Sequence, residues 1–137
     1  MRFFQKTKDG GKDSPVDGYF LVEVKGLFSI ALLKFNKGRR ESFHTHAFNA
    51  YTWFLHGELY EEELKGDSIT YTKYKKSLIP KMTPKDNNHR VKAQKDSWCF
   101  TVRGPWDDTW TEDNLNTNTK TTFTHGRKII SKEPRYL

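Results

Sequence analysis

The segment from Gly38 to Gly57 contains two histidines, His44 and His46, one residue apart, and its composition predicts extended chain. Side chains in a strand alternate between its two faces, so both imidazoles are expected on the same face. A pair of imidazoles on one sheet face is a geometry typical of metal ligands. A third nitrogen can come from His89, which follows the turn-rich run 84–88. The sequence therefore raises the question of whether histidines from two separate segments meet at one site.

The composition indicates one β-rich domain. At 137 residues the chain is long enough for a core of its own without disulfides or a structural metal. Only 34% of the residues are hydrophobic, but 15% are aromatic, which favours a core of Phe, Tyr and Trp on strands. Strand-like runs recur about every eight to twelve residues, and no segment sustains a helical period. We expect an all-β antiparallel sandwich or barrel.

The expected strands are short and separated by turn signals. They cover residues 19–25, 27–35, 50–55, 58–65, 69–75, 89–93, 97–103 and 107–111, with a terminal hairpin of 121–124 and 127–130. Residues 5–18 are expected to form a loop, and 78–79 the end of a strand. The carboxylates at 61–63 are expected to be exposed. We predict a single domain over residues 1–137, with its core at about 19–111 and a C-terminal hairpin and tail at 112–137.

The charge and the cysteine count restrict the function without choosing it. A net charge of +7 is compatible with nucleic acid, an anionic membrane or an anionic small ligand. The Lys and Arg residues are scattered, so no basic tail is indicated. The single cysteine, Cys99, excludes an internal disulfide and fits a reducing compartment. With no apolar run of membrane-spanning length and no signal peptide, we expect a soluble, cytoplasmic protein.

These motifs resemble those of the cupin superfamily. The spacing of Gly38, His44, His46 and Gly57 is similar to the first cupin signature, and His89 is similar to the histidine of the second. Three segments also resemble a little-characterised group of small bacterial and phage cupins: 43–49, 89–91 and 98–105. The resemblance covers roughly residues 20–111. It implies a double-stranded β-helix, the cupin jelly roll, with its site inside the mouth of the barrel.

The resemblance implies a metal site with one departure from the usual pattern. His44, His46 and His89 match the histidine positions, but Ala50 or Tyr51 stands where the superfamily usually has a glutamate ligand. Asn49 is a candidate fourth ligand or substrate contact through its amide oxygen. Three neutral imidazoles can hold Fe, Zn, Ni or Mn with positions left open. The alternative is a barrel whose histidines form hydrogen bonds and bind a ligand without metal.

Two further residues are candidates for substrate binding, Arg103 and Tyr51. On the strand 97–103, Cys99, Thr101 and Arg103 share one face. That face either lines a cavity, where Arg103 binds a carboxylate or phosphate through two parallel hydrogen bonds, or faces solvent. Tyr51 either stacks against a substrate or belongs to the core. Cys99 is expected to be a buried, inert thiol.

Three functions remain open from the sequence. The first is a metal-dependent enzyme of oxygenase, isomerase or lyase type that acts on a small anionic molecule. The second is a metal-free sugar-nucleotide epimerase or isomerase, with His44 or His89 as base and Tyr51 or Tyr60 as acid. The third is non-enzymatic binding or sequestration of a nucleotide-like ligand. Nucleic acid is not the favoured partner, and a homodimer formed through edge strands is a further option.

Overall fold

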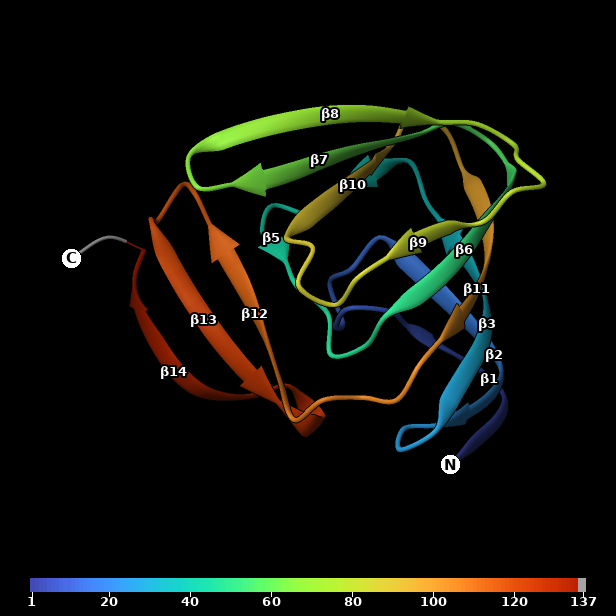
Figure 1. Cartoon of the computed structure of the whole chain (residues 1–137), viewed down its shortest axis with the longest axis horizontal. Coiled ribbons are helices and arrows are strands. Elements are labelled where there is room, and N and C mark those ends of the chain that lie inside the picture. Colours follow the sequence, from blue (N-terminus) through green and yellow to red (C-terminus); the bar gives the residue numbers. More distant parts are fainter. Residues whose placement is uncertain (136–137) are drawn as a thin grey trace.

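The computed structural model describes residues 1–135, which form antiparallel β-strands in two sheets that enclose a shared interior (Figure 1). The first sheet has the order β1, β2, β3, β11, β6, β9, which are Arg2–Lys8, Val16–Val24, Phe28–Phe35, Ser97–Arg103, Ala50–His56 and Lys81–Thr83. The second has the order β14, β13, β12, β5, β10, β7, β8, which are Lys128–Pro134, Thr119–Thr124, Thr109–Asn114, Phe43–His44, His89–Ala93, Leu59–Lys65 and Ser68–Tyr74. The short strand β4 (Gly38–Arg39) pairs with β10, and a 3-10 turn, η1 (His125–Arg127), joins β13 to β14. This arrangement confirms the predicted all-β jelly roll.

Most predicted strands lie where the sequence indicates them, and two expectations are wrong. Strands β10 and β11 have the predicted bounds, and the terminal hairpin turns at His125 and Gly126. Residues 5–8 belong to β1, which pairs with β2, so the predicted loop is limited to 9–15. Residues 78–79 are exposed and lie outside any strand. No helix among residues 1–135 has the length and apolar character needed to cross a membrane.

The C-terminal hairpin is continuous with the second sheet. Strand β12 pairs with β13 on one side and with β5 on the other, and Glu112 lies opposite His44. The hairpin of β13 and β14 extends this sheet to its edge. Strand β12 and the turn η1 therefore border the interior of the sandwich, and Figure 1 shows β13 and β14 beside β12 at the edge of this sheet.

Strand β11 buries its small and polar side chains and leaves its large apolar side chains partly exposed. Its burial alternates strictly, with Ser97, Cys99, Thr101 and Arg103 buried and the intervening aromatic and Val side chains partly exposed. The strand is central in its sheet, between β3 and β6, so one face of it must point into the sandwich. In this protein the small and polar side chains take the inner face, and Trp98, Phe100 and Val102 take the outer one.

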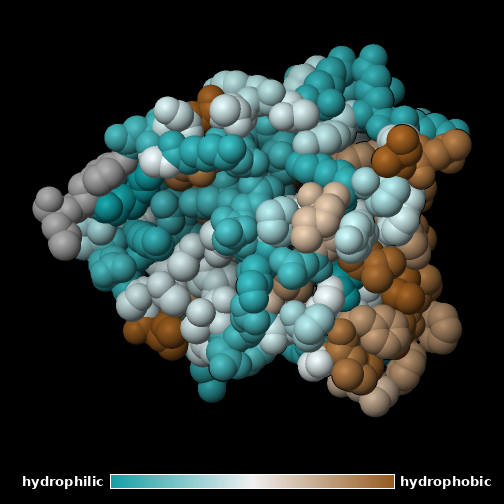
Figure 2. Space-filling view, in the orientation of Figure 1, coloured by the Kyte–Doolittle hydropathy of each residue, from teal (hydrophilic) through white to brown (hydrophobic). Residues whose placement is uncertain are grey.

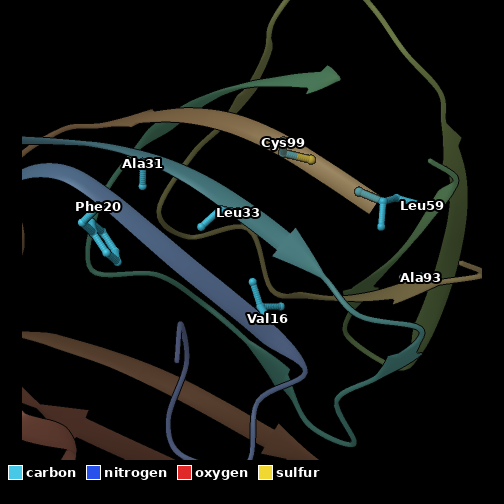
Figure 3. Packing of buried hydrophobic residues seen from close by; sticks show 7 residues of the cluster. All are labelled: Val16, Phe20, Ala31, Leu33, Leu59, Ala93 and Cys99. Atoms are coloured by element: carbon cyan, nitrogen blue, oxygen red, sulfur yellow. The ribbon is translucent and has the colours of Figure 1, made fainter. Parts of the chain in front are cut away.

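The apolar core is correspondingly small and lies toward one end of the sandwich (Figure 3). It is formed by seven buried residues: Val16, Phe20, Ala31, Leu33, Leu59, Ala93 and Cys99. A second cluster of Ala47, Phe48 and Ala50 packs against Trp106 and Trp110. The interior between these clusters is left for the polar residues that form the site.

Gly57 makes the corner at which the chain passes from the first sheet to the second. Its φ is +105°, and an added Cβ would lie 2.6 Å from Ser97 Cα and 2.1 Å from Ser97 Oγ. Ser97 cannot move aside easily, because its hydroxyl accepts a hydrogen bond from Glu58 N (2.9 Å) and donates one to Lys95 O (2.8 Å). The glycine of the sequence motif is therefore required by both its backbone conformation and its neighbour.

We predict that Gly57→Ala lowers the free energy of unfolding by about 3 kcal/mol, from the left-handed backbone and the clash with Ser97 together. Gly66 is the matched control, because its φ is +62° and an added Cβ meets nothing within 4 Å. Gly66→Ala should cost only about 1 kcal/mol, for the backbone alone. Urea unfolding followed by tryptophan fluorescence measures both values, and equal losses would contradict the role given to Ser97.

Candidate metal centre

The three histidines singled out in the sequence meet inside the sandwich. Their ring centroids form a nearly equilateral triangle, with separations of 4.8, 4.9 and 4.8 Å. One candidate ligand atom from each lies within 4.8 Å of the other two. Strand pairing explains the meeting, because His89 on β10 lies directly opposite His44 on β5. His46 lies just beyond β5, where its backbone N–H donates to Lys85 O (2.9 Å).

His44 and His46 are neutral. Burial lowers the pKa of His44 well below its ordinary value, and the nearby charge of Arg40 adds to that effect. Burial also lowers the pKa of His46, with further contributions from His89 and Arg103. A neutral imidazole carries a lone pair on one ring nitrogen, which is the form that binds metal ions.

Glu61 orients the third histidine. The sequence predicted an exposed carboxylate here, and this prediction is wrong: Glu61 is 6% exposed, and its Oε2 lies 2.5 Å from His89 Nδ1. Burial alone raises the pKa of Glu61, but His89 and Lys81 outweigh it and hold the pKa at about 2. An ionised carboxylate can only accept, so Nδ1 of His89 carries a hydrogen, and the ring presents Nε2 to His46.

These residues fit a divalent metal ion. Two imidazole nitrogens bound at about 2.05 Å to one tetrahedral ion lie about 3.3 Å apart. His46 Nε2 and His89 Nε2 are 3.3 Å apart, which matches that separation. The Nδ1 atoms of His44 and His46 are buried and have no hydrogen-bond partner among residues 1–135. Imidazole ligands favour Zn, Fe, Ni or Mn over the hard cation Ca.

Comparison with solved structures identifies the architecture. A sugar phosphate isomerase of the cupin superfamily from Silicibacter pomeroyi matches 96% of this chain and 88% of its own, with a TM-score of 0.62 and 10% identity. The Fe(II) form of HppE matches with a TM-score of 0.57 and 13% identity, over 72% of this chain and 55% of that one. Oxalate decarboxylase from Bacillus subtilis matches 69% of this chain with a TM-score of 0.55 and 10% identity. The chain has the cupin fold.

The likeness is one of fold alone. The matched part of this chain covers only 26% of the length of the oxalate decarboxylase. No family model matches its sequence, and no curated protein matches it either. The features that distinguish its site must therefore be taken from its own residues.

Two residues that the sequence offered as site candidates lie away from the three histidines. Asn49 is exposed, and its Oδ1 accepts a hydrogen bond from Lys85 N (2.8 Å), so that its amide closes the loop that also holds His46. Tyr51 is 52% exposed on the outer face of the first sheet, away from both core and cavity. Neither side chain is brought to the three-histidine cluster.

Arg103 lines the cavity next to the histidines. The cavity has a volume of about 590 Å³ and is bordered by both sheets and by the loop after β1. Arg103 is 4% exposed and binds Asp9 through two hydrogen bonds of 2.6 and 3.1 Å. Burial raises the pKa of Asp9, but the charge of Arg103 and its hydrogen bonds hold it below its ordinary value, so the pair is ionic.

Glu61 and Asp9 are the site residues that the sequence interpretation missed. The sequence does contain a signal for Glu61. Residues two apart in a strand share a face, so Glu61 is expected on the same face as the apolar Leu59, in the strand that follows Gly57. No local pattern marks Asp9, which lies 94 residues from Arg103 in the chain.

We predict that Glu61→Gln weakens metal binding about 10- to 100-fold, because His89 loses the carboxylate that fixes its tautomer. Glu62→Gln is the matched control. Its carboxylate is also buried, but it binds Arg39 and Arg90 and makes no contact with the histidines within the described chain. Competition with a chromophoric chelator gives both affinities, and an equal loss in the two variants would show that Glu61 acts only through stability.

Proposed function

We propose that this cupin is a metal-dependent enzyme that acts on a small anionic molecule in its cavity. The proposal depends on one observation: three histidines, one of them oriented by an ionised carboxylate, face one another inside a cavity of substrate size. A divalent ion held by these histidines supplies Lewis-acid polarisation or, if it is iron, oxygen chemistry. The size of the cavity is within the range of small-molecule sites.

The charge of the cavity supports an anionic substrate. Eight Lys and Arg residues border it against four Asp and Glu residues, which leaves an excess of +4 out of the +7 of the whole chain. Such an excess inside a walled space attracts anions more strongly than the same charges spread over a surface. Arg103 would bind and orient the anionic group, and the apolar side chains of Phe48 and Trp106 border the same cavity.

Sugar phosphates are the first substrate class to test. One structure with this fold is a sugar phosphate isomerase, and its length is close to that of this chain. A phosphate matches the planar fork of an arginine as well as a carboxylate does. Small carboxylates are therefore the second class.

One observation favours a second candidate, metal-free acid–base isomerisation. Glu61 accepts from His89 Nδ1, so Nε2 is the ring nitrogen that would act as a general base. The sequence candidates for the acid, Tyr51 and Tyr60, do not border the cavity. Tyr74 does border it, and its hydroxyl donates to Glu61 Oε1 (3.4 Å).

The test is metal loading followed by assay. Protein purified without a histidine tag is stripped with a chelator and reloaded with Fe(II), Zn, Ni or Mn. We expect about one ion per chain and, at a hundredfold excess over the dissociation constant, a stabilisation of about 2.7 kcal/mol. His44→Ala and His89→Ala should abolish both effects, whereas His56→Ala, on an exposed histidine outside the cavity, should leave them unchanged.

Turnover then separates the two candidates. Loaded and stripped protein are incubated with sugar phosphates and small carboxylates, and the products are followed by NMR. Turnover that requires metal supports the proposal, and turnover that survives stripping supports acid–base isomerisation by His89. Substoichiometric metal that His89→Ala does not change would contradict the metal site.

A further inference from the structure

The loop after β1 carries a carboxylate into the cavity. Asp9 accepts two hydrogen bonds from Arg103, whose guanidinium also lies 4.5 Å from the ring centre of Phe48 and 5.5 Å from that of Phe20. Arg103 is buried and held by these rings, but the Asp9 side chain is 27% exposed. If the pair separates, Asp9 is therefore the partner that can return to water.

Two more guanidinium groups lie under the same loop. Arg40 and Arg127 both donate to Glu112 Oε1, at 2.5 and 2.8 Å. Gly10 and Gly11 pack against them, because an added Cβ would lie 2.8 Å from Arg40 Nη1 and 2.9 Å from Arg127 Nε, respectively. Both glycines have φ of +102°, a conformation that other residues rarely adopt. The loop thus covers three arginines that have two carboxylates between them.

Donors in this part of the cavity remain without acceptors. Arg103 Nε and Trp106 Nε1 are buried and have no hydrogen-bond partner within residues 1–135, and both residues border the cavity. Both atoms can only donate, so what they lack is an acceptor. A buried donor without a partner costs free energy, and a ligand with several oxygen atoms would remove that cost.

We propose that the three arginines form an oxyanion subsite beside the histidines, and that Asp9 occupies it until the carboxylate or phosphate group of a ligand replaces it. This subsite deepens the proposed function, because it names the carboxylate or phosphate as the part of the substrate that the protein binds. It rests on that function only in that both use the same cavity. An internal carboxylate competes with the ligand at a fixed effective concentration. Asp9 therefore lowers the affinity for anions and restricts the subsite to ligands that bind two or more arginines.

The experiment uses inorganic phosphate and Asp9→Asn. In metal-stripped protein at constant ionic strength, calorimetric titration should show about tenfold tighter phosphate binding to Asp9→Asn than to wild type. Asp13→Asn is the matched control, because Asp13 is exposed at the far end of the same loop and has no ion pair in the described structure. It should change the affinity by less than about twofold. Adding Arg103→Met to Asp9→Asn should abolish the gain.

Each outcome decides the inference. Equal gains in Asp9→Asn and Asp13→Asn would assign the effect to net charge and overturn the subsite, as would no gain in Asp9→Asn. If Asp9→Asn does not fold, Asp9→Ser repeats the titration, and phosphate should raise its melting temperature more than that of wild type. Because the protein is stripped, failure of the metal site leaves this result unaffected, and failure of the subsite leaves the metal stoichiometry unaffected.

A second inference comes from the outer face of the first sheet. The strand registers align one row of apolar side chains across all six strands: Phe3, Val22, Ile30, Val102, Tyr51 and Met82. A parallel row consists of Tyr19, Leu32, Phe100 and Trp53. Figure 2 shows hydrophobic residues gathered on the side where Figure 1 places this sheet.

This apolar face is large enough for a stable interface. Phe3, Tyr51 and Met82 are about half exposed, at 55%, 52% and 44%. With the partly exposed members of both rows, the face offers on the order of 800 Å² to a partner, which is the contribution of one partner to a standard interface. Monomers rarely expose apolar patches of this size.

We infer that a second copy of the chain covers this face, with the two first sheets packed against each other. The first row contains no charged residue, and the second is uncharged from β2 to β6 and continues to Lys6 on β1, whereas more than half of the positive excess of the chain borders the cavity. Two copies with the same charge can therefore approach most closely through this face. A flat apolar face related to itself by a two-fold axis is self-complementary in composition.

Light scattering coupled to gel filtration tests this inference with Tyr51→Glu. Wild type should be a dimer at micromolar concentrations, and Tyr51→Glu should be a folded monomer. Tyr71→Glu makes the same substitution at a residue 69% exposed on β8 of the other sheet, and it should remain dimeric. A monomeric wild type at millimolar concentration would overturn the inference, as would dissociation by both variants or binding of the monomer to neutral lipid vesicles.

Discussion

Pairing of buried charges is the constraint on which the rest of this structure depends. Glu61 is held by His89 and Lys81, Arg103 by Asp9, and Glu23 by Arg2. Removing one member of such a pair leaves a buried charge uncompensated, which costs about 3–5 kcal/mol. The positions of these groups are therefore fixed by their partners as much as by the backbone, and the orientation of His89 is one result. The site gains its geometry from interactions that contribute little net stability themselves.

The polar interior also determines which side chains lie on the outer face of the first sheet. Alternation along a strand gives every inward polar residue an outward neighbour, and on β11 those neighbours are Trp98, Phe100 and Val102. The aromatic residues are thus divided between the interior, where Phe20, Phe43 and Phe48 are buried, and the outer face of the first sheet. The first sheet therefore has apolar side chains on both faces: a small core on its inner face and a broad apolar surface on its outer face.

The sequence is sufficient for the fold, which depends on short-range signals, and for the meeting of the three histidines, which the resemblance to the two cupin signatures implies. Period-two alternation defines β10 and β11, and the spacing of His44, His46 and Gly57 defines the corner. The role of Glu61 was not predicted, because three consecutive carboxylates in a sequence are typical of a solvated surface. Its partner, His89, lies 28 residues away and diagonally opposite on the paired strand. Asp9 was missed because its partner, Arg103, lies 94 residues away on a central strand of the first sheet, and no local pattern links the two residues.

Cys99 gives this molecule a built-in reporter. The thiol lies on the inner face of β11, borders the cavity, and is fully buried, and its burial raises the pKa to about 12. It is the single cysteine of the chain, so any thiol chemistry reports on one position without mutation. Because the thiol is fully buried, reagents reach it only when the structure around it opens. The rate of its labelling is therefore a measure of how often the interior of this protein is open to solvent, with or without metal and anion.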